Sequence, residues 1–442
     1  MRSEIQEKAM SARNTALAVL IACRKRDGWS DAILKDCLRR DRLDTRDAAL
    51  AARLCYGVLQ NRMLLDYYLS HFVKPPLKKL QPVVLDILRL GAYQLTMLER
   101  IPASAAINEA VEQTKRSAGR QAAGLVNGTL RSMARAGEAL PEPPDLSVRY
   151  SHPAPLVDLL RESVGEELLE PLLRCGNEAP STVVQRNPLR CGEKELLDAW
   201  DEKGTAWTRH PWMPGCFLLK GGPVSAPGFQ EGWFYVQDAA ARLAVRAAGL
   251  KPGMRVLDCC AAPGGKSFAA AIEMENRGEI TACDIHPHKL PLIEAGAKRL
   301  GADIVKTVLQ DAAAPREDWA DRMDAVLVDA PCSGLGVIRK KPDIRYKDLA
   351  GMEQLPELQK QILRNAGRYV KPGGTLLYST CTVLKRENEA VTEDFLERNR
   401  DFVPEPVTLP EALHRAGAAM VTLLPCTDEC DGFFVAKLRK TI

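Results

Sequence analysis

The sequence of 442 residues lacks any apolar run near the ~18 consecutive residues that a membrane-spanning helix needs. Residues 1–8 are polar and include acids, with no apolar core behind them, which predicts no secretory signal. The content of 46% hydrophobic and 27% charged residues is typical of a globular chain with two or three domains. We therefore expect a cytoplasmic protein without a membrane partner.

The cysteine pattern of a disulfide framework is also missing. There are 13 cysteines, an odd number spread over a long chain. The two close pairs, Cys259-Cys260 and Cys426/Cys430, lack the two-residue gap of a zinc knuckle. We expect no metal site, and most cysteines, such as Cys55, should be small buried side chains. The sequence contains neither an internal repeat nor a low-complexity segment.

Positive charge is concentrated in the first third of the chain. Residues 1–145 hold 23 Lys and Arg against 16 Asp and Glu, whereas the remainder holds 38 against 41. A basic region of this kind fits binding of a polyanion. A solvated helical surface is the other interpretation, and charge alone favours it somewhat.

Residues 11–139 carry the apolar spacing of helices throughout. Leu17, Leu20 and Ile21 recur at helical intervals, and Pro82 opens a strongly apolar helix. With no strand pattern in this region, we expect an all-α domain over 1–140. Three prolines within residues 141–144 then predict an extended linker.

Residues 146–232 predict a small α+β domain. Its expected elements are a helix over 155–173, a strand over 181–187, a helix over 193–200 and a strand over 216–219. Five of its side chains are of types that stack on or pair with nucleic acid: Arg186, Trp207, Arg209, His210 and Trp212. Burial of the tryptophans in the core is an equally good interpretation.

From residue 233 to 442 strands alternate with helices. The expected strands are 254–258, 278–284, 304–311, 324–329 and 375–380, and the expected helices are 267–274, 291–300 and 352–370. Repeated βα units predict an α/β fold with a doubly wound parallel sheet and helices on both faces. Residues 433–438 should close the sheet as an antiparallel strand.

The loop after the first of these strands has the character of a ligand site. It consists of Cys260, Ala261, Ala262, Pro263, Gly264, Gly265 and Lys266. Small residues there let the backbone approach a ligand closely, but neither GxGxxG nor a nucleotide P-loop is present. A pyrophosphate is therefore disfavoured.

Acids follow the next three strands at or near their ends. These acids are Asp284, Asp311 and Asp329. Asp284 stands about 20 residues past the glycines, a position where a carboxylate accepts hydrogen bonds from ribose hydroxyls. A turn-capping role would explain Asp284 alone, but not three acids at successive strands. An adenosine ligand without phosphates fits this arrangement, and we expect S-adenosylmethionine.

The last of these strands and the strand that follows it both run into cysteines. Residues 324–334 lead through Asp329 to Cys332, and residues 375–382 lead to Cys381. Adjacent strands would place both thiols in one crevice. Each cysteine by itself could equally be a buried strand-end residue. The spacing does not decide which of the two would be a nucleophile.

The motifs around these residues resemble those of the RNA 5-methylcytosine methyltransferases. Residues 329–336, with Arg339 and Pro342-Asp343, resemble the fourth motif, and 378–382 with 387–389 the sixth. Residues 260–266 resemble the cofactor loop, and 431–434 the closing motif. The helical region before them is similar to a NusB-type RNA-binding domain, a pairing found in the RsmB type of ribosomal small-subunit RNA methyltransferase.

The resemblance implies a Rossmann-like methyltransferase domain over 233–442 that methylates carbon 5 of a cytosine in 16S ribosomal RNA. It assigns attack on the base to Cys381 and product release to Cys332, with Asp329 near both the base and the cofactor. We expect a monomer. Alternatives are a transfer RNA cytosine-5 methyltransferase and a catalytically silent RNA-binding assembly factor.

Overall fold

The computed structural model describes residues 11–26, 29–137 and 139–441. The chain forms two compact units. The first comprises Met1–Asp158, Leu173–Glu178 and Ile338–Lys347, and the second comprises Leu159–Leu172, Ala179–Val337 and Asp348–Ile442. Within the described residues, no helix is long and apolar enough to cross a membrane. The three domains expected from the sequence, over residues 1–140, 146–232 and 233–442, remain a proposal.

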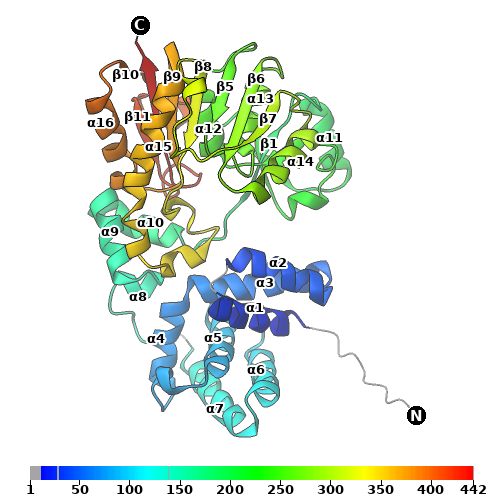
Figure 1. The fold of residues 1–442 in the computed structure, drawn as a ribbon. Helices are drawn as coiled ribbons and strands as arrows, with labels where there is room; N and C mark the ends of the chain where they lie inside the picture. Colours follow the sequence, from blue (N-terminus) through cyan, green and yellow to red (C-terminus); the bar gives the residue numbers. More distant parts are fainter. Residues whose placement is uncertain (1–10, 27–28, 138, 442) are drawn as a thin grey trace. The chain divides into compact units, whose positions relative to one another are not determined.

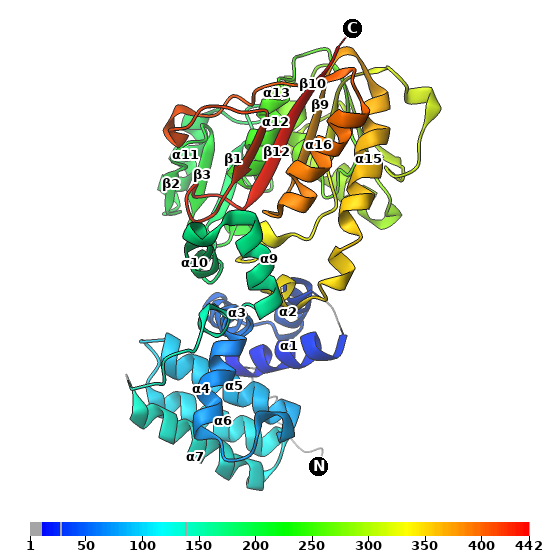
Figure 2. The same ribbon diagram turned by 90° about the vertical axis from the view of Figure 1, so that its left-hand side faces the viewer.

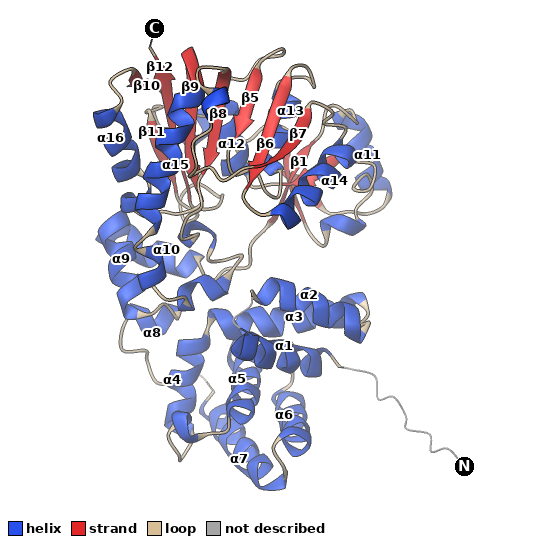
Figure 3. Ribbon diagram, in the orientation of Figure 1, coloured by secondary structure: helices blue, strands red, loops and turns tan. Residues whose placement is uncertain are grey.

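Helices make up the first unit throughout its described residues (Figures 1 and 3). In chain order its main helices are α1 (Ala12–Arg26), α2 (Ser30–Asp41), α3 (Thr45–Gln60), α4 (Arg62–Phe72), α5 (Pro82–Met97), α6 (Ala103–Ser117), α7 (Arg120–Ala136) and α8 (Leu146–Tyr150). The predicted all-α character of this region is confirmed.

Helix α5 lies at the centre of this bundle. Its side chains Ile87 and Leu88 are fully buried, as expected for a helix that is apolar on most of its surface. Gly57 of α3 lets the two helices approach closely, because a Cβ there would lie 2.0 Å from Cζ of Tyr93. The packing of α3 on α5 therefore depends on the absence of a side chain at residue 57.

A segment from the far end of the sequence completes the helical unit. Within Ile338–Lys347, Arg345 is only 1% exposed, and burial lowers the pKa of its guanidinium to about 10. Among the described residues, no carboxylate forms an ion pair with it. Four oxygens accept its hydrogen bonds at 2.5–3.2 Å: the carbonyls of Gln60, Tyr150 and Gly176 and Oδ1 of Asn177.

The second unit contains a small four-stranded antiparallel sheet with the order β2-β3-β1-β4. Its strands are β1 (Thr182–Arg186), β2 (Trp207–Arg209), β3 (Cys216–Leu219) and β4 (Phe234–Val236), and its helix is α11 (Glu193–Glu202). The helices α9 (Ala154–Val164) and α10 (Glu166–Cys175) each have residues in both units. Trp200 of α11 is fully buried and makes T-shaped contacts with Phe217 and Phe234. An aromatic cluster thus forms the core under this sheet.

The large sheet of the second unit has the order β10-β12-β9-β8-β5-β6-β7, with β11 paired to β12. Its strands are β5 (Arg255–Asp258), β6 (Glu279–Asp284), β7 (Val305–Leu309), β8 (Met323–Asp329), β9 (Val370–Thr380), β10 (Phe402–Pro404), β11 (Met420–Leu423) and β12 (Phe433–Lys440). Strands β5 to β9 run parallel, and β12 pairs antiparallel with β9. The predicted doubly wound α/β fold is confirmed.

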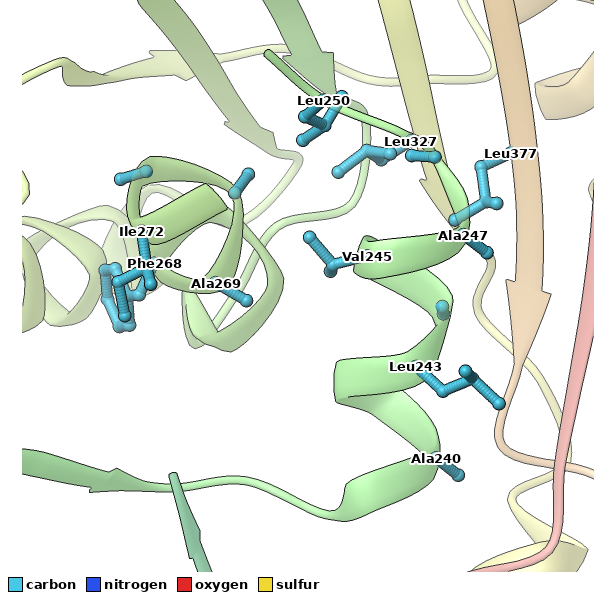
Figure 4. Close-up of a cluster of buried hydrophobic side chains, with 14 of the residues drawn as sticks. Ala240, Leu243, Val245, Ala247, Leu250, Phe268, Ala269, Ile272, Leu327 and Leu377 are labelled. Atoms are coloured by element: carbon cyan, nitrogen blue, oxygen red, sulfur yellow. The ribbon is translucent and has the colours of Figure 1, made fainter. Parts of the chain in front are cut away.

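Helices cover both faces of this sheet. They are α12 (Ala239–Ala247), α13 (Gly265–Glu273), α14 (Leu290–Leu300), α15 (Leu355–Tyr369) and α16 (Glu389–Arg398). Figure 2 shows α15 and α16 together beside β9 and β12. Successive strand residues alternate between faces, so Val256 packs in one cluster with α12 and α13 and Leu257 in another with α15 and α16. Figure 4 shows part of the first cluster, including Leu243 of α12 and Phe268 of α13.

This topology places the loops that follow β5, β6, β8 and β9 at one edge of the sheet. In open α/β sheets ligands bind at this carboxyl edge. The predicted pairing of the fourth and fifth strands is confirmed, since β8 and β9 lie side by side with Asp329 opposite Ser379. Asp311 stands two residues beyond the end of β7 rather than within it.

Candidate active site

The two strand-end cysteines lie in contact. Strands β8 and β9 end level with each other, and the Sγ atoms of Cys332 and Cys381 are 3.3 Å apart. Both side chains are half-buried. The sequence predicted that one crevice would hold both thiols, and the structure brings them within hydrogen-bonding distance.

The pair is electrostatically asymmetric. The pKa of Cys332 is raised well above its usual value, first because its thiol is hydrogen-bonded to Cys381 and second because it is desolvated. The pKa of Cys381 is lowered, chiefly because it accepts that hydrogen bond, with a smaller contribution from the positive charge of Lys266. The two directions together favour Cys332 as the donor and Cys381 as the sulfur that carries negative charge.

A buried glutamate holds the loop that carries Cys332. Oε2 of Glu387 accepts the backbone N–H of Ser333 at 2.9 Å and Nε2 of Gln359 at 2.9 Å. Gln359 also donates to the carbonyl of Pro331 at 2.9 Å. The backbone on both sides of Cys332 is thus fixed by side chains from α15 and from the turn after β9.

A buried asparagine does the same for the loop that carries Cys381. Oδ1 of Asn388 accepts the hydroxyl of Thr380 at 2.6 Å, and its Nδ2 donates to the carbonyl of Thr382 at 3.0 Å. The Thr382 hydroxyl lies 2.8 Å from that of Ser333. This last contact joins the two cysteine loops directly.

Two glycines bring the closing motif against these loops. Gly336 N–H donates to the carbonyl of Cys381 at 2.9 Å, and Gly432 N–H donates to the carbonyl of Gly336 at 2.9 Å. A Cβ on Gly336 would lie 1.9 Å from the carbonyl oxygen of Gly432. Only glycine fits this backbone crossing.

Lys266 and Asp329 form an ion pair beside the cysteines. Nζ of Lys266 is 2.6 Å from Oδ2 of Asp329, and the lysine side chain is 10% exposed. The Ser379 hydroxyl donates to Oδ1 of Asp329 at 3.1 Å. Lys266 also lies 5.0 Å from the centre of the Phe433 ring. The last residue of the predicted cofactor loop thereby meets the acid that ends β8.

The rest of the predicted cofactor loop, Cys260–Lys266, joins β5 to α13. Ala261 N–H donates to the carbonyl of Cys283 at 2.7 Å, and Gly264 adopts a φ of 108° at the start of α13. The Ser267 hydroxyl donates to Asp258 at 2.7 Å, and burial raises the pKa of Asp258 to about 6. Because residues 261–265 are Ala, Ala, Pro, Gly and Gly, they present backbone without bulky side chains.

The other two predicted acids, Asp284 and Asp311, each use one carboxylate oxygen in a hydrogen bond to the backbone. Oδ1 of Asp284 accepts the N–H of His286 at 2.9 Å, and Oδ1 of Asp311 accepts that of Ala313 at 2.9 Å. Their Oδ2 atoms receive no hydrogen bond from the described part of the chain. Asp284 is 7% exposed, whereas Asp311 is exposed. Both acids retain an acceptor for ligand hydroxyl or amine groups.

The five nucleic-acid candidates of the small sheet fall outside this cluster. Trp212 and His210 are buried, and Nε1 of Trp212 donates to the carbonyl of Asp428 at 2.7 Å. Trp207 packs on the Trp200 and Phe217 rings. Arg186 and Arg209 are both ion-paired with Glu193. Throughout the described residues there is no group of three or more His, Cys, Asp or Glu side chains suited to a metal.

Sequence reasoning gave no role to three residues of this cluster. Glu387 and Asn388 stand within the sixth motif without an assigned role, and Gln359 is one residue of the helix expected over 352–370. All three are buried polar side chains. The sequence alone predicts an exposed position for each of them, because polar residues on helices and turns usually face solvent.

Both regions of the chain match known proteins. Residues 247–439 match the sequence model of the 16S rRNA methyltransferase RsmB/F family, and residues 10–135 match that of the NusB family. The crystal structure of PH0851 aligns over 97% of this chain and 98% of its own, with 26% identity and a TM-score of 0.80.

Curated relatives match the chain from end to end. The ribosomal RNA small subunit methyltransferase B of Klebsiella pneumoniae is 35% identical over 91% of this chain and 92% of its own. A protein of Bacillus subtilis named probable ribosomal RNA small subunit methyltransferase B is 38% identical over 98% of this chain and 99% of its own. The chain therefore belongs to the RsmB/F family of methyltransferases, with a NusB-like domain at its N-terminal end.

Proposed function

We propose that this protein transfers a methyl group from S-adenosylmethionine to carbon 5 of a cytosine in 16S ribosomal RNA. The reaction would pass through a covalent bond between Cys381 and the base. The observation that carries the proposal is the 3.3 Å contact of two thiols with opposite pKa shifts at the carboxyl edge of the sheet. Family membership supports the methyl transfer and the ribosomal substrate.

The residues of the loop fit the cofactor. Backbone-only residues from Ala261 to Gly265 leave room for a ligand, and the spare oxygens of Asp284 and Asp311 match the hydroxyls of a ribose and the amine of an adenine. We assign the cofactor to Cys260–Lys266, Asp284, Asp311 and Asp329. When bound, its sulfonium supplies the methyl group.

Carbon 5 of cytosine is too weak a nucleophile to take a methyl group directly. Addition of the Cys381 thiolate to carbon 6 forms a Cys381–carbon 6 bond and makes carbon 5 enamine-like. A lowered pKa suits this step, since the thiolate and not the thiol attacks. Electron density that builds on the ring would be relieved at nitrogen 3 by the Lys266–Asp329 pair, which holds a proton next to a carboxylate.

Release of the product requires that the bond between Cys381 and carbon 6 break again. After methyl transfer the proton on carbon 5 must leave, its electron pair re-forms the carbon 5–carbon 6 double bond, and the bond from carbon 6 to Cys381 breaks. We assign the acceptor of that proton to Cys332. Cys332 can accept that proton only as a thiolate, so the proton on its own sulfur must first pass to solvent. Its raised pKa makes the thiolate, once formed, a strong base.

The activity has a direct test. Purified protein should transfer labelled methyl to unmodified 16S ribosomal RNA, and Cys381→Ala should abolish transfer. Failure with this RNA and with deproteinised total RNA would refute the proposal. A bisulfite-resistant site that depends on this protein in transfer RNA instead would favour a transfer RNA substrate. An assembly factor without catalysis predicts that Cys381→Ala leaves the cellular phenotype intact.

The target base must be unpaired or flipped out to reach the sulfurs. A separate RNA-binding region is therefore required, and we assign it to the NusB-like unit. Ribosomal RNA as substrate places the protein in the cytoplasm. We propose that it acts there as a monomer without a metal.

A further inference from the structure

A broad groove crosses the surface of the helical unit. It has a volume of about 1020 Å³ and lies between α1, α3, the end of α5 and the start of α6. Four arginines line it, Arg13, Arg46, Arg53 and Arg100, against one acid, Glu99. We call it the arginine groove.

The guanidinium groups of this groove are not neutralised by the protein. Nε of Arg13 donates to Oε1 of Gln94 at 2.7 Å, which is an uncharged partner. Arg46, Arg53 and Arg100 are exposed and form neither an ion pair nor a hydrogen bond with any described residue. Three long cationic side chains thus stand around one depression with their donors unused.

Two other surface cations of the same unit are ion-paired. Arg39 lies 2.6 Å from Asp36, and Lys115 lies 2.6 Å from Glu112. Both pairs join residues one helical turn apart, so their charge is largely compensated at the surface. The groove differs from these two sites in charge balance, and it gathers its arginines around one depression.

The shape of the groove suggests a chain-like anion. Arg46 and Arg53 project from one face of α3 two turns apart, about 10 Å along the helix axis. Between them and across the groove the wall is apolar, formed by Leu50, Met97 and Ile101. Guanidinium groups bind phosphate bidentately, and an apolar wall suits the sugar and base faces between phosphates.

We propose that the arginine groove binds a single-stranded segment of the RNA substrate through its phosphates. The lining contains no aromatic side chain on which bases would stack, so the contact positions the RNA without reading its sequence. The identity of the RNA rests on the proposed function, whereas the binding of single-stranded RNA does not.

The test compares two double variants of the full-length protein by fluorescence anisotropy, with a labelled single-stranded RNA oligonucleotide of mixed sequence as probe. The first is Arg46→Gln/Arg53→Gln. The matched control, Arg39→Gln/Lys115→Gln, removes the same charge from exposed positions of the same unit. Loss of two phosphate contacts should weaken binding by about tenfold and lower the slope of log K against log salt by about 1.4. The control should change neither value beyond a small fraction of this.

Equal loss in the two double variants would overturn the proposal, because net charge would then explain it. Unchanged binding in the groove variant would do the same. Duplex RNA and a polyglutamate peptide serve as alternative probes. If the groove variant bound either of these more weakly while its binding of single-stranded RNA stayed unchanged, the assignment would also be refuted. With 16S ribosomal RNA, the groove variant should raise KM and leave kcat unchanged. If wild-type protein transfers no methyl, the proposed function fails while the anisotropy result still stands.

Discussion

Two substitutions at residue 332 separate the two proposed roles of its thiol. We assign Cys332 as the donor of the hydrogen bond that lowers the pKa of Cys381 and as the acceptor of the carbon 5 proton. Cys332→Ala abolishes both effects. Cys332→Ser removes the proton acceptor but leaves an O–H group that can donate to the Cys381 sulfur.

The size of the first effect follows from the contact. A hydrogen bond to a charged group contributes roughly 1.5–3 kcal/mol. Loss of the donor should therefore raise the pKa of Cys381, because its thiolate loses this stabilisation. Lys266 remains in Cys332→Ala and retains part of the stabilisation.

The assay follows the rate at which iodoacetamide modifies the peptide containing Cys381, by mass spectrometry over a series of pH values. Cys332→Ala should shift the pH profile to the alkaline side, while Cys332→Ser should stay close to wild type. Both variants should accumulate a covalent protein–RNA adduct on denaturing gels. Cys381→Ala should form none.

Two results would refute this reasoning. Coincident pH profiles for wild type and Cys332→Ala would show that the 3.3 Å contact does not set the charge on Cys381. An adduct in Cys381→Ala, with none in Cys332→Ala, would exchange the roles of the two residues.

Three further predictions concern stability and backbone fit. The pKa of Asp258 is about 6 in the folded protein and 3.8 in the unfolded chain, so this residue favours folding below pH 4 and loses that contribution as the pH rises through 6. Between these limits the unfolding free energy of the wild type, measured by urea titration, should fall by about 3 kcal/mol relative to that of Asp258→Asn. Parallel pH curves for the two proteins would contradict this. Arg345→Leu leaves the buried carbonyls of Gln60 and Gly176 without their donor and should cost about 3 kcal/mol or more in unfolding free energy, against little for Leu at the 79% exposed Arg39; equal costs would contradict it. Gly336→Ala forces the Cys332 loop away from a backbone carbonyl and should lower kcat about 100-fold, whereas Gly351→Ala, in open space, should keep wild-type activity.

The architecture was predictable where one periodicity dominates a long segment. Val326 and Leu327 belong to a continuous apolar run that only a strand buried on both faces explains, and the alternation with helices then requires a parallel sheet. Very short strands gave no such pattern. The strands β2 and β4 have three residues each, too few to show alternation, and they exist because β3 and β1 offer free edges to pair with.

Partnerships across the sequence were not predictable from local pattern. Arg345 reads as an exposed cation next to a proline turn, yet it is buried in the helical unit by oxygens that include the carbonyl of Gln60, 285 residues earlier. The Lys266–Asp329 pair is a similar case. Periodicity tells which face a residue occupies but not which distant backbone will meet it, so such contacts require the three-dimensional structure.

The position of the two sulfurs depends on backbone contacts more than on the thiols themselves. Glu387 fixes the loop of Cys332, and a hydroxyl contact and the Gly336 crossing join that loop to the one carrying Cys381. Each contact exists whether or not a sulfur is present. The 3.3 Å separation is therefore preorganised by the scaffold, and replacement of Cys332 by Ser should leave the loops in place. For this reason, the serine variant separates proton acceptance from loop geometry, which a large substitution in this crevice would not do.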